Sequence, residues 1–198
     1  MNIHGTIPAL MLILSLSLIL AGCSAPLPVP GGAPPTTGPP ATQTASGDSA
    51  FSSLYSQSSV DVAARILNVN SKFYSSSTDA GVTYSPANLR MAALDMSSTA
   101  EGYHTSMIGI MNFATQANEL KRNEYLGYLT SISTAGKDIA EAASAENSNQ
   151  YALAMNFATL ARTALDRIEG VPDQESRDAI TSMKAHLDDY IQRMRDKL

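Results

Sequence analysis

Residues 85–117 read SPANLRMAALDMSSTAEGYHTSMIGIMNFATQA and carry the most regular hydrophobic pattern in the chain. Apolar residues recur there at alternating spacings of four and three, at Leu89, Ala93, Met96, Ala100, Tyr103, Met107, Ile110, Ala114 and Ala117. This spacing places them on one side of an α-helix, as in a coiled-coil seam about four heptads long. Ser85-Pro86 favours a helix start, because a hydroxyl can cap the first N–H groups and proline fits the first helical position. The pattern predicts a helix through the whole stretch. It ends in a turn at 118–123, or it continues as one rod into the next helix.

Helical spacing of apolar residues extends through the rest of the chain from residue 48 onward, without the alternation of a strand. Further helices are predicted over about 49–74, 124–145, 149–168 and 173–197, with a polar loop at 75–84. The predicted inward positions are Phe51, Tyr55, Val62, Ile66, Val69, Phe73, Tyr125, Leu126, Leu129, Ile132, Ile139, Ala143, Tyr151, Ala154, Phe157 or Ala158, Ala161, Leu165, Ile168, Ile180, Met183, Leu187, Tyr190 or Ile191, Met194 and Leu198. Amphipathic helices with short connections predict an all-α fold, an antiparallel bundle of four to five helices.

The charge distribution divides the chain into two unlike parts. Residues 1–47 contain no Asp, Glu, Lys or Arg, and the net charge of −5 therefore belongs to the predicted bundle, 48–198. An acidic domain lacks the clustered basic face that nucleic acid requires, and it is not attracted to an anionic membrane surface. A single cysteine excludes an internal disulfide framework and a site built from several cysteines. The composition therefore predicts no nucleic-acid partner.

The N-terminal part begins with an apolar run, residues 7–21, that ends in Leu20-Ala21-Gly22-Cys23. About 15 residues are too few to span a bilayer but suit a signal-peptide core. A leucine, two small residues and a cysteine resemble the lipobox of prokaryotic lipoproteins, bacterial or archaeal. The resemblance, which covers residues 1–23 only, implies cleavage after residue 22 and a diacylglycerol on the Cys23 thiol. The first six residues lack Lys and Arg, so an uncleaved anchor with a free cysteine is the alternative.

The linker that follows, residues 23–47, is rich in proline, glycine and threonine. Proline removes backbone donors and fixes φ, so neither helix nor sheet propagates, and the segment has no apolar face to bury. We expect a disordered tether after a signal peptide at 1–22. At about 3.1 Å per residue it reaches at most roughly 70 Å from the lipid.

Motifs that carry chemistry are sparse in the predicted bundle. Glu101-Gly102-Tyr103-His104 has the Glu-x-x-His spacing of di-iron bundles, but that site needs a second copy and two more glutamates. His186, near Asp188 and Asp189, lacks convergent spacing. We therefore predict no catalytic, metal or cofactor-binding residues. One alternative is a ligand pocket between helices, lined from Tyr103, Met107, Met111, Phe113, Tyr125, Tyr128, Tyr151, Met155 and Phe157, although such residues usually fill cores.

The sequence thus predicts a lipoprotein at the cell membrane, anchored through Cys23 and facing out of the cytoplasm, into the periplasm or at the cell surface. Its bundle is expected to be non-enzymatic and to have a structural or interaction role with a protein partner of unknown identity. The alternatives are a ligand-binding or sensor-like bundle and an enzyme of unidentified class. The motif Met-Asn-Phe-Ala-Thr occurs at 111–115 and again at 155–159, which fits either a duplicated helical hairpin or coincidence.

Overall fold

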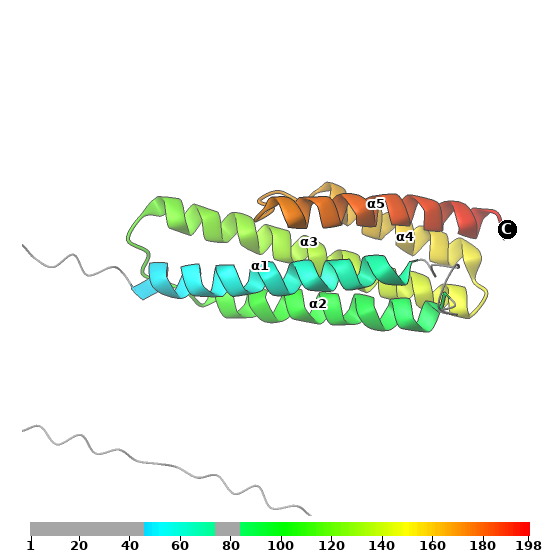
Figure 1. The fold of residues 1–198 in the computed structure, drawn as a ribbon, viewed down its shortest axis with the longest axis horizontal. Helices are drawn as coiled ribbons and strands as arrows, with labels where there is room; N and C mark the ends of the chain where they lie inside the picture. Colours follow the sequence, from blue (N-terminus) through cyan, green and yellow to red (C-terminus); the bar gives the residue numbers. More distant parts are fainter. Residues whose placement is uncertain (1–45, 74–83) are drawn as a thin grey trace, which may run out of the picture. The chain divides into compact units, whose positions relative to one another are not determined.

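The computed structural model describes residues 46–73 and 84–198, which form five helices (Figure 1). They are α1 (Ser46–Lys72), α2 (Pro86–Ile108), α3 (Gln116–Asn147), α4 (Tyr151–Asp166) and α5 (Gln174–Arg195). The described residues contain no strand. The predicted leader, the lipobox with Cys23, the linker up to residue 45 and most of the predicted loop at 75–84 lie outside the described residues.

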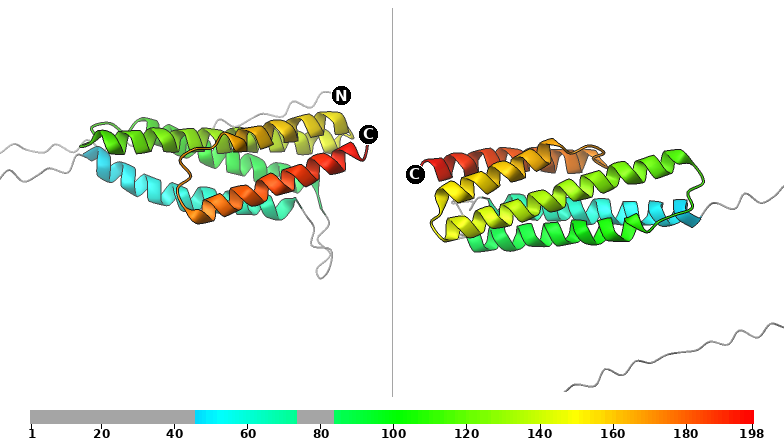
Figure 2. Two further views of the ribbon diagram at one scale, coloured as in Figure 1. Left: turned by 90° about the horizontal axis from the view of Figure 1, so that it is seen from above. Right: turned by 180° about the vertical axis from the view of Figure 1, so that it is seen from behind.

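Consecutive helices run antiparallel and pack side by side, and α5 returns to pack on α1 (Figures 1 and 2). Because the number of helices is odd, α5 runs in the same direction as α1. The start of α2 follows the capping chemistry that Ser85-Pro86 indicated, and α5 is capped in the same way. The Ser85 side chain accepts a hydrogen bond from the Asn88 N–H, and the Asp173 carboxylate accepts one from the Ser176 N–H at 2.7 Å. The predicted all-α antiparallel bundle is confirmed.

Most predicted inward positions form the bundle core. Those in the core are Phe51, Val62, Ile66, Val69, Phe73, Leu89, Ala93, Met96, Ala100, Met107, Tyr125, Leu129, Ile132, Ile139, Ala143, Ala154, Ala158, Ala161, Leu165, Ile180, Met183, Leu187, Tyr190 and Met194. Those only half-buried are Tyr55, Tyr103, Leu126, Tyr151, Phe157, Ile168 and Ile191. Leu198 was placed wrongly, because it follows the end of α5 and is 72% exposed.

The predicted helix over 85–117 is too long at its C-terminal end. α2 ends at Ile108, residues 109–115 form a loop, and Thr115 caps α3, its hydroxyl accepting from the Asn118 N–H. Asn112 takes a left-handed conformation with φ +62°, which a helix cannot contain and which asparagine tolerates better than most residues. The regular spacing of Ile110, Ala114 and Ala117 therefore belongs to no single helix, and Ala114 and Ala117, which were predicted to face inward, are exposed. The turn predicted at 118–123 lies inside α3.

Small residues bring α2 and α3 close together. A Cβ on Gly136 of α3 would lie 2.8 Å from the Ala93 carbonyl oxygen and 3.0 Å from the Ser97 Cβ, both on α2. The buried Ser97 and Ser133 hydroxyls meet across the same interface at 3.1 Å. The two helices thus approach closely at a position where any Cβ would press on backbone atoms of the facing helix.

Candidate functional site

The Glu101–His104 motif lies in a groove between α2 and α3. The groove has a volume of about 220 Å³ and is lined by Glu101, His104, Leu129, Thr130, Ser133, Thr134 and Lys137. The Glu101 carboxylate pairs with the Lys137 ammonium and accepts a hydrogen bond from the Ser133 hydroxyl at 3.1 Å. These contacts, the Lys137 hydrogen bond first, lower the pKa of the Glu101 carboxyl below its usual value. A carboxylate held in its charged form by a neighbouring cation is a poor general base.

The motif does not assemble a metal centre. Within residues 46–73 and 84–198, no three His, Cys, Asp or Glu side chains lie close enough together to hold a metal ion. His186, the other histidine considered, stacks on the Phe73 ring at 5.7 Å between centroids. Burial lowers the pKa of the His186 imidazole, and Asp189 opposes that shift. His186 therefore contributes to packing between α5 and the end of α1.

Among the described residues the most enclosed charge is that of Glu146, which the sequence did not single out. It lies in the last turn of α3 with its side chain 5% exposed, in contact with the Lys197 ammonium at 3.0 Å. The Tyr84 hydroxyl donates to its other carboxylate oxygen. Glu146 is 62 residues from Tyr84 and 51 from Lys197, so no local pattern could indicate this group.

Aromatic rings and a second cation complete the surroundings of Glu146. The Arg193 guanidinium lies 4.8 Å from the Tyr84 ring centroid and 5.3 Å from that of Tyr190, whose hydroxyl donates to the Ala142 carbonyl. Burial, followed by the nearby Glu146 carboxylate, raises the pKa of Tyr84 above its usual value, and the same two causes raise that of Tyr190. Both hydroxyls therefore stay protonated and act as donors. The cluster joins the segment before α2, the end of α3 and the end of α5.

The aromatic and methionine residues considered for a ligand pocket are distributed through the molecule. Met107, Tyr125 and Tyr128 are buried in the core, whereas Met111 is 65% exposed. Tyr125 and Tyr128 stack at 5.2 Å between ring centroids, and the Tyr125 hydroxyl accepts from the buried Ser58 hydroxyl at 3.0 Å. These rings occupy the interior by packing on one another, which is the role of core residues.

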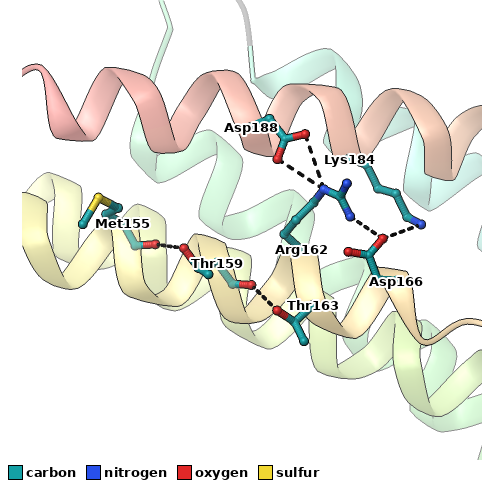
Figure 3. Close-up of polar contacts among 7 residues, drawn as sticks. All are labelled: Met155, Thr159, Arg162, Thr163, Asp166, Lys184 and Asp188. Carbon is teal, nitrogen blue, oxygen red and sulfur yellow. Dashed lines mark hydrogen bonds and ion pairs between the residues drawn. The ribbon is translucent and has the colours of Figure 1, made fainter.

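The outer face of α4 is uncharged over most of its length and carries two exposed leucines. Leu153 and Leu160 are 42% and 46% exposed, and Arg162 and Asp166 near the C-terminus are the charged residues of this helix. The Thr159 and Thr163 hydroxyls donate to carbonyl oxygens one turn earlier in α4, both at 2.9 Å (Figure 3). Their hydrogen-bonding capacity is partly used within the helix, so α4 presents methyl and methylene groups to the outside together with the exposed Asn156 amide.

Charged side chains mark the end of this face. Arg162 pairs with Asp166 one turn on and with Asp188 of α5 at 3.2 Å, and Lys184 of α5 reaches Asp166 at 3.0 Å (Figure 3). These ion pairs fix α5 against α4 and lie beside the apolar residues. The face is therefore uncharged along most of α4 and is bounded by charged side chains at its C-terminal end; depletion of charge is also found at the centre of protein–protein contacts.

The recurrent Met-Asn-Phe-Ala-Thr motif does not mark a duplicated helix. Its first copy, 111–115, forms the loop before α3, and its second copy, 155–159, lies within α4. The structure therefore does not support the repeated hairpin.

Comparison with protein-family models, with characterised proteins and with solved structures finds no match to this chain. Neither a family nor a related fold therefore identifies the activity of the bundle.

Proposed function

We propose that this protein is a lipoprotein, anchored in the cell membrane through a lipid on Cys23, that presents a non-enzymatic helical bundle outside the cytoplasm. The observation that carries the proposal is Leu20-Ala21-Gly22-Cys23 at the end of an apolar run that is too short to span a bilayer. No helix among the described residues is long and apolar enough to cross a membrane. A lipid on Cys23 would supply the membrane attachment.

The character of the bundle supports a role in protein contact. Its polar clusters, around Glu101 and around Glu146, are occupied by internal ion pairs and hydrogen bonds. The apolar face of α4, with Leu153 and Leu160 exposed, is by contrast available to a partner. Apolar side chains with a charged border are what a protein partner would bury.

The anchor is tested by mass spectrometry of the protein isolated from the membranes of a bacterial host. We expect a mature chain that begins at Cys23 and carries a diacylglycerol. The matched variant Cys23→Ser should keep its leader and carry no lipid. A wild-type chain that still begins at Met1, or that carries an unmodified Cys23, would refute the anchor.

The contact role is tested by placing a photo-crosslinking residue at Leu160 in the membrane-bound protein. We expect a discrete crosslinked protein at this position and a much weaker product at Val60, an exposed apolar residue of α1. A ligand-binding role would instead be favoured if native membranes yield a small molecule bound to the bundle and no crosslinked protein.

A further inference from the structure

One end of the bundle combines exposed apolar side chains with the point at which the chain enters the fold. We call this end the tip and define it as residues 46–52 of α1, residues 106–108 of α2, the loop 109–115, and residues 116–123 of α3. Ile108, Met111 and Leu120 of the tip are 54%, 65% and 53% exposed. Ile108 and Met111 line one surface groove together with Phe113. Leu120 lies on the second turn of α3.

The loop that carries Met111 is held in place by the start of α1 and by α3. The Asp48 carboxylate accepts a hydrogen bond from the Ala114 N–H at 3.3 Å, and the Arg122 guanidinium donates to the Ile110 carbonyl. A Cβ on Gly47 would lie 2.1 Å from the Met111 carbonyl oxygen, so the backbones touch. Met111 therefore protrudes from a fixed backbone.

The charge of the tip differs from that of the rest of the domain. Its two acidic residues, Asp48 and Glu119, are balanced by Lys121 and Arg122, whereas the net charge of −5 lies on the remainder of the chain. Arg122 is itself paired with Glu119 at 3.6 Å. An anionic membrane repels an acidic surface, and this repulsion falls off within about 10 Å in salt. The tip, neutral overall and with three exposed apolar side chains, is thus the part of the bundle that can approach a bilayer most readily.

The chain outside the structure favours the same orientation. Residues 24–45 separate the proposed lipid on Cys23 from Ser46 at the start of α1, and α1 starts at the tip (Figure 1). The α3–α4 connection and the end of α5 lie at the opposite end (Figure 1). Since α3 has 32 residues at 1.5 Å each, that end lies about 48 Å farther along the bundle. Because the chain enters the fold at the tip, the tip is the part of the bundle that the linker holds nearest to the anchor on average.

We propose that the tip rests in the head-group region of the membrane that carries the anchor, with Ile108, Met111 and Leu120 against the lipid. The inference rests on the proposed lipid at Cys23. Apolar side chains on a protruding end enter the boundary between head groups and acyl chains to a depth of about 5–10 Å. Docking of this kind sets the bundle upright and leaves α4 free along its side.

The test uses the membrane-processed chain with Met111→Cys, labelled with an environment-sensitive fluorophore and reconstituted into phosphatidylcholine vesicles with a quencher on the lipid head groups. The native cysteine is blocked by its lipid, so the label attaches at position 111. We expect blue-shifted emission and quenching at least about threefold stronger than in the matched variant Leu153→Cys on α4. Adding Ile108→Ser and Leu120→Ser should reduce the quenching at position 111. Val60→Ser with Leu67→Ser, also at exposed apolar positions, should leave it unchanged.

The same samples distinguish failure of the docking from failure of the anchor. Mass spectrometry that finds Cys23 unmodified overturns both proposals. Equal quenching at positions 111 and 153 in a chain with lipidated Cys23 overturns only the docking. Emission at position 111 that shifts with protein concentration in detergent, without lipid quenching, shows that a second copy covers the tip and also overturns the docking.

Discussion

Replacing Gly136 with alanine tests how closely α2 and α3 approach. The Cβ of the new side chain would lie 2.8 Å from the Ala93 carbonyl oxygen and 3.1 Å from the Ser97 backbone nitrogen. Both are backbone atoms of the facing helix, so relief requires a shift of the whole helix. Gly127, nine residues earlier in α3, is the matched control, because a Cβ there meets nothing within 4 Å.

The two substitutions make the same change in helix propensity and differ in packing. Alanine in place of glycine inside an exposed helix adds about 1 kcal/mol to the free energy of unfolding. We expect that gain for Gly127→Ala. At Gly136 the same gain is opposed by overpacking, which typically costs about 1–3 kcal/mol. The net result for Gly136→Ala is between no change and a loss of about 2 kcal/mol.

The assay is urea unfolding of the unlipidated chain from Ser24 onward, followed by helical circular dichroism. The dependence of the free energy on urea should stay constant, so that midpoint shifts report stability. The difference between the two variants should be about 1–3 kcal/mol, or roughly 2–10 °C in melting temperature for a domain of this size. Equal stability of Gly136→Ala and Gly127→Ala would show that the two helices do not touch at this point.

Three further changes test the buried hydroxyls, the buried carboxylate and the acid response. Tyr125→Phe should cost about 1 kcal/mol in urea unfolding, because it removes the buried hydrogen bond between the Ser58 and Tyr125 hydroxyls. Tyr128→Phe should be close to neutral, since among the described residues the buried Tyr128 hydroxyl makes no hydrogen bond of standard geometry. Glu146→Ala should destabilise the chain by about 1–3 kcal/mol, because it leaves the Tyr84 hydroxyl without an acceptor; a cost below that of Lys197→Met would contradict this reading. Arg162 and Lys184 hold the pKa of Asp166 below its usual value. On acidification the unfolded chain therefore binds a proton at Asp166 before the folded chain does. The stability that the ionised Asp166 contributes is fully present above the ordinary carboxyl pKa and is lost as the pH falls through the lowered pKa of the folded state. Urea midpoints at neutral and acid pH should show a smaller acid loss in Asp166→Asn than in the wild type, and an unchanged loss would count against the ion pairs.

The sequence was informative wherever burial follows helical spacing. Met96, Ala100 and Met107 were predicted to face inward and are buried. Their spacing decides which side of the helix they lie on, and the bundle has a single core for that side to face. The same spacing failed beyond Ile108, since α2 ends there and Asn112 turns the chain in a left-handed conformation, and neither changes the hydrophobic pattern. Periodicity therefore places residues on a helix face but does not show that the helix continues.

The polar clusters could not be predicted, because their members meet only after the helices have packed. Glu146 was an unremarkable acidic residue near the predicted end of a helix. Its burial depends on Tyr84 and Lys197, which lie in two distant segments. The Glu101–His104 motif was noticed because its residues are close in sequence. However, the groups that decide its chemistry, Ser133 and Lys137, belong to the neighbouring helix.

The proposed anchor and the proposed docking of the tip depend on each other energetically. Three partly exposed apolar side chains would give a free domain only weak affinity for a bilayer, since each contributes at most about 1.5–3 kcal/mol on full burial and the association costs freedom of motion. A lipid on Cys23, about 22 residues before the start of α1, changes this balance between contact energy and lost freedom of motion. It holds the tip at an effective concentration in the millimolar range, so weak contacts are enough to keep it docked. In this arrangement the lipid determines where the protein lies and the tip determines how it is oriented. The face of α4 that carries Leu153 and Leu160 would then lie along the side of an upright bundle. Its height above the membrane would be determined by how deeply the tip, including the first turns of α3, enters the head-group region.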